Sequence, residues 1–417
     1  MLETGKGKFP FSLIFPLIAR TIFPLLDTTR GAGMIVLCGV TALAYYRLQE
    51  VAGLPVARPS QRTDLSGASC SVAEAREAFD LVCRMPADEL AGHGLAFAVG
   101  TDTGPYVGTR VSRRGRDLCF SGPLHVLVGD HTHRAHNSRV VRHIWSGQVP
   151  SGSLRHVEGN VYVVSPDLLL LQMTRVLGCS HTSQRSRGMT LRGLHRLTWL
   201  ADELCSDMAL LPSGLVLRDG EREQRFVRRP RVTTAAELRG YYARFGTAEG
   251  TRAVPGLADM RKVLAWVREG AEAPNEISEA VMLGLPTWAG GMGHDSIELQ
   301  VSFELDRENA ALTGTRSCRV DLFVRASNCA LESDGRFDHV RTPDGVVRDQ
   351  TRDMVLRSLG MHLEHVTWSN FRSFDFVLQL NRRLCALRGS RRRKVSERTL
   401  ARWREVHADL LDVNLVR

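Results

Sequence analysis

Apolar and polar residues alternate in different ways along this chain, and each pattern predicts a kind of element. The apolar run Ile35–Val40 leads into a helical stretch, Thr41–Arg47. Val72–Met85 repeats its apolar residues at steps of three and four, which predicts an amphipathic helix. Beyond position 118 the pattern changes to short runs typical of β-strands. These runs are Leu124–Val128, Arg139–Trp145 and Asn160–Val164.

Helical periodicity dominates the next part of the chain. Ser165 suits an N-cap and Pro166 a first helical turn. Helices are expected over Leu168–Val176, Gly193–Cys205, Thr233–Tyr242 and Gly256–Glu269. The charged segment Asp219–Arg231 and the segment Gly270–Pro274 read as a loop and a linker. We therefore expect an α/β (α+β) protein with an α+β region over residues 34–257, a second domain over 273–384 and a basic tail over 385–417.

The first 33 residues contain an apolar run that resembles a membrane anchor or signal peptide in composition only. Arg20 interrupts the run, and Pro10, Pro16 and Pro24 disfavour a helix. Neither half reaches the roughly 20 residues that a membrane span needs. We expect residues 1–33 to be a poorly defined extension, the fold to begin near Met34, and the protein to have no membrane partner.

Composition narrows the class of protein. Hydrophobic residues make up 43% and charged residues 24%, a balance typical of a globular rather than a disordered chain. The formal net charge of +10 favours a polyanionic partner, although a basic surface without a specific partner would give the same count. The nine Cys are scattered and form no CxxC pair, which predicts reduced thiols and a cytoplasmic protein.

Three carboxylates stand on two neighbouring strand-like runs near the end of the chain. Asp321 lies in the first run, Glu332 and Asp334 lie in the second, and the loop between the runs is short enough for a hairpin. Period-two alternation places Glu332 and Asp334 on the same face. Carboxylates that converge repel one another, and a hard cation such as Mg²⁺ or Mn²⁺ relieves that repulsion. The alternative is an ordinary exposed hairpin without a metal.

The order of motifs around this hairpin resembles the very-short-patch-repair branch of the PD-(D/E)xK nuclease fold. A helix begins at Ala273-Pro-Asn-Glu276, and Leu285–Gly291 supplies a Leu-Pro and Gly-Gly segment. After the two carboxylate strands come an Arg-Asp-x-x-Arg helix that starts at Arg348, a Gly turn and a last strand, Leu359–Trp368. The resemblance covers residues 273–384 and implies a restriction-endonuclease-like mixed sheet flanked by helices, preceded by a separate α+β region.

The resemblance also implies a metal site. Asp321, Glu332 and Asp334 would hold Mg²⁺ or Mn²⁺, and Glu276 would approach from the first helix. The metal would activate water for the hydrolysis of a phosphodiester. His339 would position or deprotonate that water, because an imidazole accepts a proton near neutral pH. Otherwise His339 serves only to cap a loop.

Arginines after the hairpin are the expected contacts to DNA. Arg348 and Arg352 would hold phosphate oxygens with two hydrogen bonds each. The alternative for Arg352 is an ion pair with Asp349 or with a carboxylate of the site, in a purely structural role. In the tail, Arg391, Arg392 and Arg393 either follow a phosphate backbone or are simply solvated.

One departure from the wider nuclease pattern bears on activity. The position that is usually Lys in the Glu-x-Lys motif is Asp334 in this chain. That Lys helps to orient water and to stabilise the transition state, and Arg348 or Arg352 would have to replace it from the next helix.

The first two thirds of the chain resemble the N-terminal part of abortive-infection-type antitoxins and related regulators. The residues that carry this resemblance are Val40–Ala44, Gly122–His125 and Val163–Leu168. It implies DNA as a partner, together with a toxin or a second copy of the chain. His131, His133 and His136 have a spacing compatible with a metal, but without a supporting Cys we interpret them as a loop.

The sequence leaves three hypotheses about function. The leading one is a metal-dependent DNA endonuclease in phage defence or DNA repair. The second is a DNA-binding, antitoxin-like transcriptional regulator whose nuclease fold is inactive. The third is a structural or protein-interaction module, which requires only the fold.

Overall fold

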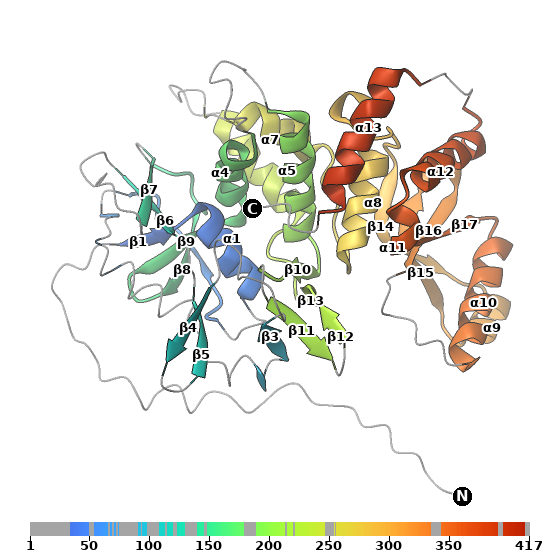
Figure 1. Ribbon diagram of the computed structural model, residues 1–417, viewed down its shortest axis with the longest axis horizontal. Coiled ribbons are helices and arrows are strands. Elements are labelled where there is room, and N and C mark those ends of the chain that lie inside the picture. Colours follow the sequence, from blue (N-terminus) through green and yellow to red (C-terminus); the bar gives the residue numbers. More distant parts are fainter. Residues whose placement is uncertain are drawn as a thin grey trace, which may run out of the picture. The chain divides into compact units, whose positions relative to one another are not determined.

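The structure is a computed structural model, and Met34–Arg417 form one compact unit within it (Figure 1). The expected extension 1–33, most of the expected helix Val72–Met85 and the loop with His131, His133 and His136 lie outside the described residues. The structure describes residues 34–49, 54–65, 67–68, 71, 74, 91–92, 94–97, 108–112, 115–119, 123–129, 140–145, 148–178, 189–212, 215–219, 222–246, 254, 256–334, 343–390 and 395–412.

The protein is a mixed α/β structure in which the first large sheet has six strands. Its strand order is β2-β8-β9-β1-β6-β7, with β1 parallel to β9, β6 parallel to β7 and the other pairs antiparallel. The expected strands are confirmed as β6, β7 and β9. The six strands are β1 (Ile35–Leu37), β2 (Arg58–Ser60), β6 (Leu124–Val128), β7 (Val140–Ile144), β8 (Leu154–Glu158) and β9 (Val161–Val164).

Helices pack beside this sheet, and smaller sheets complete the first part of the chain. The helices are α1 (Gly39–Leu48), α4 (Pro166–Gly178), α5 (Leu191–Leu204), α6 (Ala235–Ala243) and α7 (Leu257–Leu264). Helix α7 ends five residues before the expected helix, at Leu264. The small sheets contain β3 (Leu95–Phe97), β4 (Gly108–Ser112), β5 (Gly115–Cys119), β10 (Met208–Leu210), β11 (Leu215–Asp219), β12 (Arg222–Gln224) and β13 (Phe226–Arg228).

The last third of the chain builds a four-stranded sheet in the order β14-β15-β16-β17. The first two pairs are antiparallel, and β16 and β17 are parallel because α10 crosses over between them. The elements are α8 (Pro274–Gly284), β14 (Ile297–Glu304), α9 (Arg307–Thr313), β15 (Ser317–Val324), β16 (Cys329–Asp334), α10 (Pro343–Ser358), β17 (His362–Thr367), α11 (Trp368–Phe371), α12 (Phe374–Leu387) and α13 (Glu397–Leu410).

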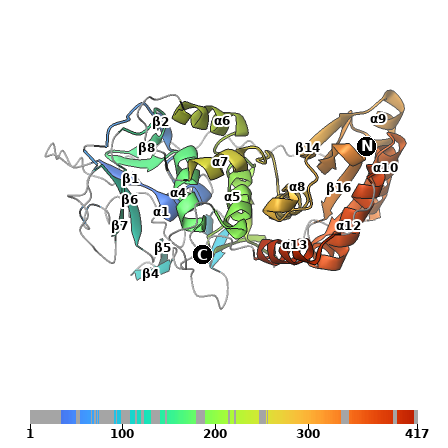
Figure 2. The ribbon, with the colours of Figure 1, turned by 90° about the horizontal axis from the view of Figure 1, so that it is seen from above.

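Two hydrophobic clusters cover the two faces of this sheet. Leu322 and Leu331 pack toward α8, α12 and α13, whereas Val320 and Ala330 pack toward Val355 of α10. In Figure 2, α8 lies between α5 and the C-terminal sheet, in agreement with its contacts to both. The hairpin and the β16–α10–β17 crossover thus have the order that the sequence predicts for residues 273–384.

The boundaries within the chain differ from the expected ones. The segment Gly270–Pro274 is tied to the structure, since the Gly270 N–H donates to the Cys205 carbonyl at 3.2 Å and Ala271 is fully buried. The expected tail contains α13, whose Trp403, Val406 and Leu410 are buried in the cluster that α8 shares. The sequence predicted a solvated tail because charged residues dominate this segment. The structure differs because the few apolar residues of α13 are buried.

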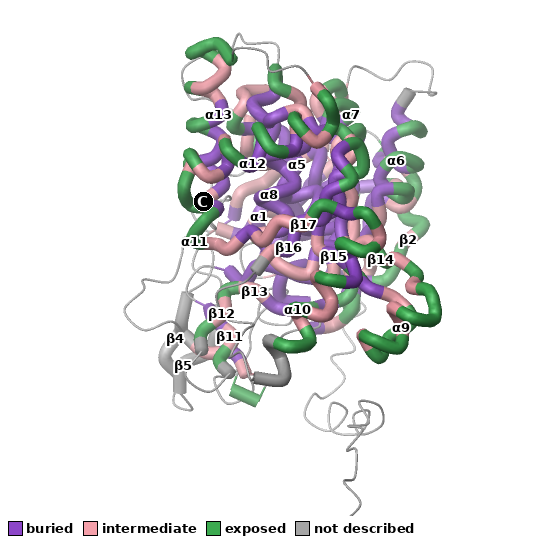
Figure 3. The backbone as a smooth tube through the Cα atoms, turned by 90° about the vertical axis from the view of Figure 1, so that its right-hand side faces the viewer, coloured by how far each residue is buried: buried purple, intermediate pink, exposed green. Residues whose placement is uncertain are grey.

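Helix α5 joins the two parts of the chain because it contributes residues to a hydrophobic cluster beside each of the two large sheets. Leu197 and Leu200 belong to the cluster beside the six-stranded sheet, whereas Trp199 belongs to the cluster beside the C-terminal sheet. The Trp199 indole N–H donates to the Ser278 hydroxyl at 3.1 Å. Figure 3 shows the buried backbone of α5 and α8 in purple. The region over residues 34–257 is therefore not separate from the C-terminal domain.

Among the residues that the structure describes, no helix combines the length and the apolar character that crossing a membrane requires.

A buried carboxylate fastens α13 to α5. Asp409 accepts from His195 Nε2 at 2.5 Å, and from Arg196 and Arg192 at 2.6 Å and 2.8 Å. Burial alone would raise the pKa of Asp409, but the hydrogen bonds from His195 and Arg196 outweigh it and lower that pKa well below its usual range. This contribution to stability is present above the pKa of an unfolded Asp, about 4, and is lost as the pH falls below it.

We expect Asp409→Asn to lower the free energy of unfolding at pH 7 by about 2–4 kcal/mol, because it leaves the mostly buried guanidinium of Arg196 without its counter-charge and weakens the hydrogen bond to the buried His195. Urea unfolding followed by circular dichroism measures the change. Glu405→Gln on the same helix removes an exposed carboxylate and is the matched control. Equal stability of the two variants would contradict the role assigned to Asp409.

Candidate functional site

The hairpin that carries the predicted carboxylates is formed by β15 and β16. Leu322 pairs with Leu331 and Phe323 with Ala330, a register that brings Asp321 beside Glu332 on the neighbouring strand. Asn328 closes the turn with a positive φ of 45°, a conformation that Asn tolerates better than most residues. The predicted hairpin is thus confirmed, and it brings two of the predicted site residues together.

At Asp321 the regular alternation of side chains in the sheet is interrupted, because residues two positions apart face opposite sides. In β15, Val320 packs toward α10 but Leu322 packs toward α8; in β14, Leu299 packs toward α8 but Val301 toward α10. Gln300, between the last two, has a positive φ of 51°. Such a backbone kink in a strand re-aims its side chains. Gln300 and Asp321 are neighbours at this kink, and their polar side chains belong to neither apolar cluster.

Gln300 links two carboxylates that come from different elements. Its amide Nε2 donates to Glu276 Oε2 of α8 at 2.9 Å and to Asp321 Oδ1 of β15 at 3.3 Å. Glu276 also accepts from the Glu272 N–H at 3.0 Å, and Asp321 accepts from the Ser333 N–H at 2.8 Å. Glu276 and Asp321 therefore lie close together, as the resemblance implied for the first helix and the first carboxylate strand.

Burial raises the pKa of both carboxyls because it removes water from their charged forms. The pKa of Glu276 rises to about 8, first through burial and then through the negative charge of Asp321. The pKa of Asp321 also rises through burial, although the hydrogen bond from Ser333 opposes the rise. The pair can therefore hold a proton near neutral pH, which relieves the repulsion between the two carboxylates.

The third carboxylate, Glu332, has a guanidinium as its partner. Arg352 of α10 donates from Nη1 and Nη2 to the two oxygens of Glu332 at 2.9 Å and 2.8 Å. The same Nη2 contacts the backbone carbonyl of Arg319. Burial raises the pKa of Glu332 to about 7 even though the charge of Arg352 opposes the rise. Of the two roles considered for Arg352, the ion pair with a carboxylate of the site is the one observed.

Residues that the sequence did not single out surround this centre. The Ser333 hydroxyl donates to Glu279 of α8 at 3.0 Å. His365 of β17 lies in register with Glu332 and hydrogen-bonds through Nε2 to Asp353 of α10 at 2.9 Å. The parallel pairing of β16 with β17 brings His365 beside Glu332. In the sequence, only the crossover connection between the two strands could have indicated this position.

The remaining predicted residues are placed in part or lie outside the described residues. Arg348 is exposed on α10, and it has no hydrogen bond or ion pair to the residues that the structure describes. Asp334 is the last residue of β16, and its side chain is not described. His339 and the arginines Arg391, Arg392 and Arg393 lie outside the described residues.

The described side chains, as arranged, do not fit a divalent metal ion. Within the described ranges, no three Asp, Glu, His or Cys side chains are grouped so that they could hold one. Both oxygens of Glu332 face Arg352, and both oxygens of Asp321 accept hydrogen bonds from Ser333 and Gln300. A guanidinium instead of a metal ion supplies the positive charge that these carboxylates need, so we derive no reaction step through a metal.

Comparison of the sequence with protein-family models, with curated proteins and with solved structures finds no match.

The raised pKa of Glu276 predicts a pH dependence of stability. The folded protein holds this proton up to about pH 8, whereas the unfolded chain releases it near pH 4.5, so stability falls as the pH rises between these values. We expect Glu276→Gln to remove a slope of about 1 kcal/mol per pH unit in this window. Urea unfolding at pH 5, 6.5 and 8 measures it.

Glu304→Gln is the control, because Glu304 is exposed at the end of β14. If the wild type and Glu276→Gln lose stability in parallel from pH 5 to pH 8, the buried, protonated state of Glu276 is wrong.

Proposed function

We propose that this chain is a DNA-binding protein that contacts the phosphate backbone through the basic segment Arg382–Arg404, and that its nuclease-like domain does not cleave. The observation that carries the proposal is the charge of this segment, which has ten Lys or Arg and a single acidic residue, Glu397. Such a density of cations displaces counterions from a polyanion. The segment covers the end of α12, the start of α13 and the residues between them.

Three described arginines of the basic segment are available to a ligand. Arg382, Arg398 and Arg404 are exposed, and none of them has a carboxylate partner among the described residues. Helix α13 is itself fixed by the burial of Trp403 and Val406 on its other face. The exposed guanidinium groups therefore project from a rigid support, which lowers the entropy lost when they bind phosphates.

The acidic centre, which consists of Glu276, Asp321 and Glu332, supports binding without cleavage. Arg352 neutralises Glu332, and the position of the usual motif Lys is Asp334. A bidentate guanidinium–carboxylate pair that is mostly buried is costly to break, because it leaves both charges without partners. With the regulator-like resemblance of its first two thirds, the chain fits a DNA-binding regulator of the antitoxin type.

The proposal predicts DNA binding that weakens steeply with salt. We expect the triple variant Arg382→Ala, Arg398→Ala, Arg404→Ala to reduce the slope of log K against log salt by about 2–3, since each lost phosphate contact removes about 0.9. Fluorescence anisotropy with a 30-base-pair duplex at 50–300 mM NaCl measures the slope. The matched control changes Arg239, Arg261 and Arg307 to Ala, which removes the same charge from exposed positions on α6, α7 and α9. The same loss in both triple variants would overturn the proposal, and so would the absence of DNA binding by the wild type.

The second candidate function is the metal-dependent DNA endonuclease, and the gathering of Glu276, Asp321 and Glu332 favours it. The charge of Asp321 raises the pKa of each of the other two, so the three carboxylates lie within one electrostatic neighbourhood. A plasmid nicking assay in Mg²⁺ or Mn²⁺, with EDTA and Asp321→Ala as controls, separates the two functions. Nicking that both controls abolish would establish the endonuclease, whereas an intact plasmid that is still retarded on a gel supports the proposed regulator.

The role given to Arg352 predicts a gain of metal binding when it is replaced. We expect Arg352→Gln to bind Mn²⁺ in isothermal titration calorimetry, because it frees both oxygens of Glu332 beside Asp321 and Glu276. The wild type and the double variant Arg352→Gln, Glu332→Gln should bind none at the same concentration. Circular dichroism verifies that each variant is folded. Equal Mn²⁺ binding by the wild type would show that Arg352 does not close the site.

A further inference from the structure

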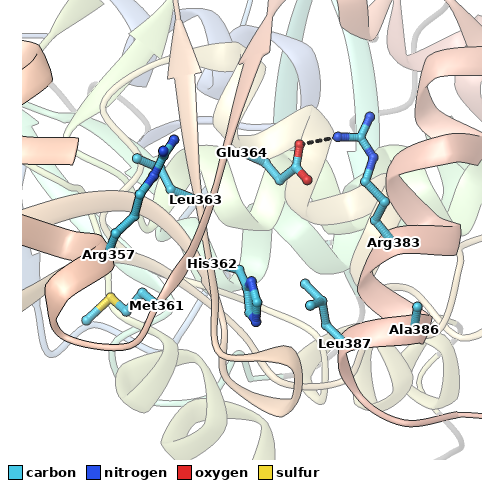
Figure 4. A pocket seen from close by; sticks show the side chains of 8 residues that line it. All are labelled: Arg357, Met361, His362, Leu363, Glu364, Arg383, Ala386 and Leu387. Carbon is cyan, nitrogen blue, oxygen red and sulfur yellow. Dashed lines mark hydrogen bonds and ion pairs between the residues drawn. The ribbon is translucent and has the colours of Figure 1, made fainter. Parts of the chain in front are cut away.

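A pocket of about 480 Å³ lies at the start of β17, the last strand of the C-terminal sheet (Figure 4). Four consecutive residues, Met361, His362, Leu363 and Glu364, form its floor at the start of β17. Side chains of consecutive strand residues point to opposite faces of a sheet. A pocket lined by all four therefore lies along the edge of the strand and not on one of its faces.

The edge of β17 at this pocket has main-chain groups that can accept a further strand. β17 is the last strand in the order of the sheet, and its described partner is β16 alone. The His362 N–H donates to the Asn328 carbonyl at 2.9 Å and so points toward β16. Main-chain direction alternates along a strand, so the N–H and C=O of Leu363 point outward into the pocket.

Arginines stand on the two sides of this edge. In Figure 4, Arg357 of α10 and Arg383 of α12 lie on opposite sides of β17. Arg357 is exposed and has no partner among the described residues. Arg383 donates from Nη1 to Glu364 at 2.6 Å, while its side chain remains 46% exposed. The charged residues that line the pocket are two Arg and one Glu, which favours an anionic ligand.

We propose that this pocket binds an extended acidic peptide segment that adds a strand to the edge of β17. Main-chain hydrogen bonds to Leu363 would align the segment, as in other cases where a peptide extends a sheet. Successive side chains of an extended segment alternate in direction, so two adjacent acidic residues reach Arg357 and Arg383 on the two sides. Leu387 and Met361 would cover the apolar neighbours of these acids. A nucleic acid lacks the alternating main-chain donors and acceptors that the strand edge requires.

The test uses full-length protein and a fluorescein-labelled, blocked hexapeptide of sequence Val-Thr-Asp-Glu-Val-Thr. Its Asn-Gln analogue removes the charge, and a form N-methylated on alternate backbone amides removes main-chain donors. We expect the acidic peptide to bind and each altered peptide to bind at least tenfold more weakly in fluorescence anisotropy. Arg357→Ala and Arg383→Ala should each weaken binding about tenfold, and Arg348→Ala, an exposed arginine of the same helix as Arg357, should leave it unchanged.

A second measurement locates the peptide. In ¹⁵N-labelled protein, the amide of Leu363 should shift and become protected from hydrogen exchange when the peptide is added. Absence of binding at millimolar peptide, equal binding of the Asn-Gln analogue, or an unperturbed Leu363 amide would overturn the proposal. Binding of a single-stranded oligonucleotide that depends on both Arg357 and Arg383, without peptide binding, would assign the pocket to nucleic acid instead. Neither the peptide test nor the oligonucleotide test uses variants of Arg382, Arg398 or Arg404, so the DNA-binding proposal can fail independently.

Discussion

Helix α5 is buried on nearly all its sides, and three of its buried polar side chains, Glu203, Asp202 and His195, are each bound by a different part of the chain. Glu203 forms a bidentate ion pair with Arg47 of α1, at 2.9 Å and 2.7 Å, and Asp202 accepts the Arg268 N–H at 2.8 Å from the segment that leads to α8. His195 reaches Asp409 of α13. A buried charge without a partner costs several kcal/mol, so these partners must all be in place when α5 is buried. The six-stranded sheet, the connecting segment and the C-terminal helix are thereby joined to one helix.

This arrangement explains why the C-terminal part of the chain does not form a separate compact unit. Its helix α8 packs against α5 through Ser278 and Trp199, and its last helix α13 returns to α5 through Asp409. The exposed Arg382, Arg398 and Arg404 lie on α12 and α13, and both helices bury residues in the cluster beside the C-terminal sheet. A ligand that binds these arginines meets a surface whose position is set by the core of the whole compact unit.

The group of Glu276, Asp321 and Glu332 combines buried carboxyls with a guanidinium that opposes their charge. At the kink of Gln300, the polar side chains of Gln300 and Asp321 lie outside both apolar clusters, and α8 and α10 bring Glu276 and Arg352 from opposite faces of the sheet. Burial favours neutral carboxyls, and the charge of Arg352 favours an ionised Glu332, so the two effects oppose each other at one residue. The balance between burial and the charge of Arg352 decides whether the carboxylates accept a cation from solution. Because Arg352 is held on both oxygens of Glu332, it already neutralises that carboxylate.

Local patterns in the sequence determined much of the secondary structure. The Pro166 helix, the strands Leu124–Val128 and Asn160–Val164, and the hairpin with Asp321 and Glu332 follow from periodicity, capping and turn length, which act over a few residues. Three of the predicted site residues are neighbours. The hairpin register places Asp321 beside Glu332, and Gln300 links Asp321 to Glu276.

Tertiary structure alone decided what these residues contact. The parallel pairing of β16 with β17 placed His365 beside Glu332, and the crossover helix placed Arg352 on both of its oxygens. Neither contact has a signature in local spacing, because the partners are 20 or more residues apart and meet only when the sheet is assembled. The same holds for α13: its basic sequence suggested a solvated tail, but the burial of Trp403, Val406 and Leu410 depends on an apolar surface that α5, α8 and the sheet create together.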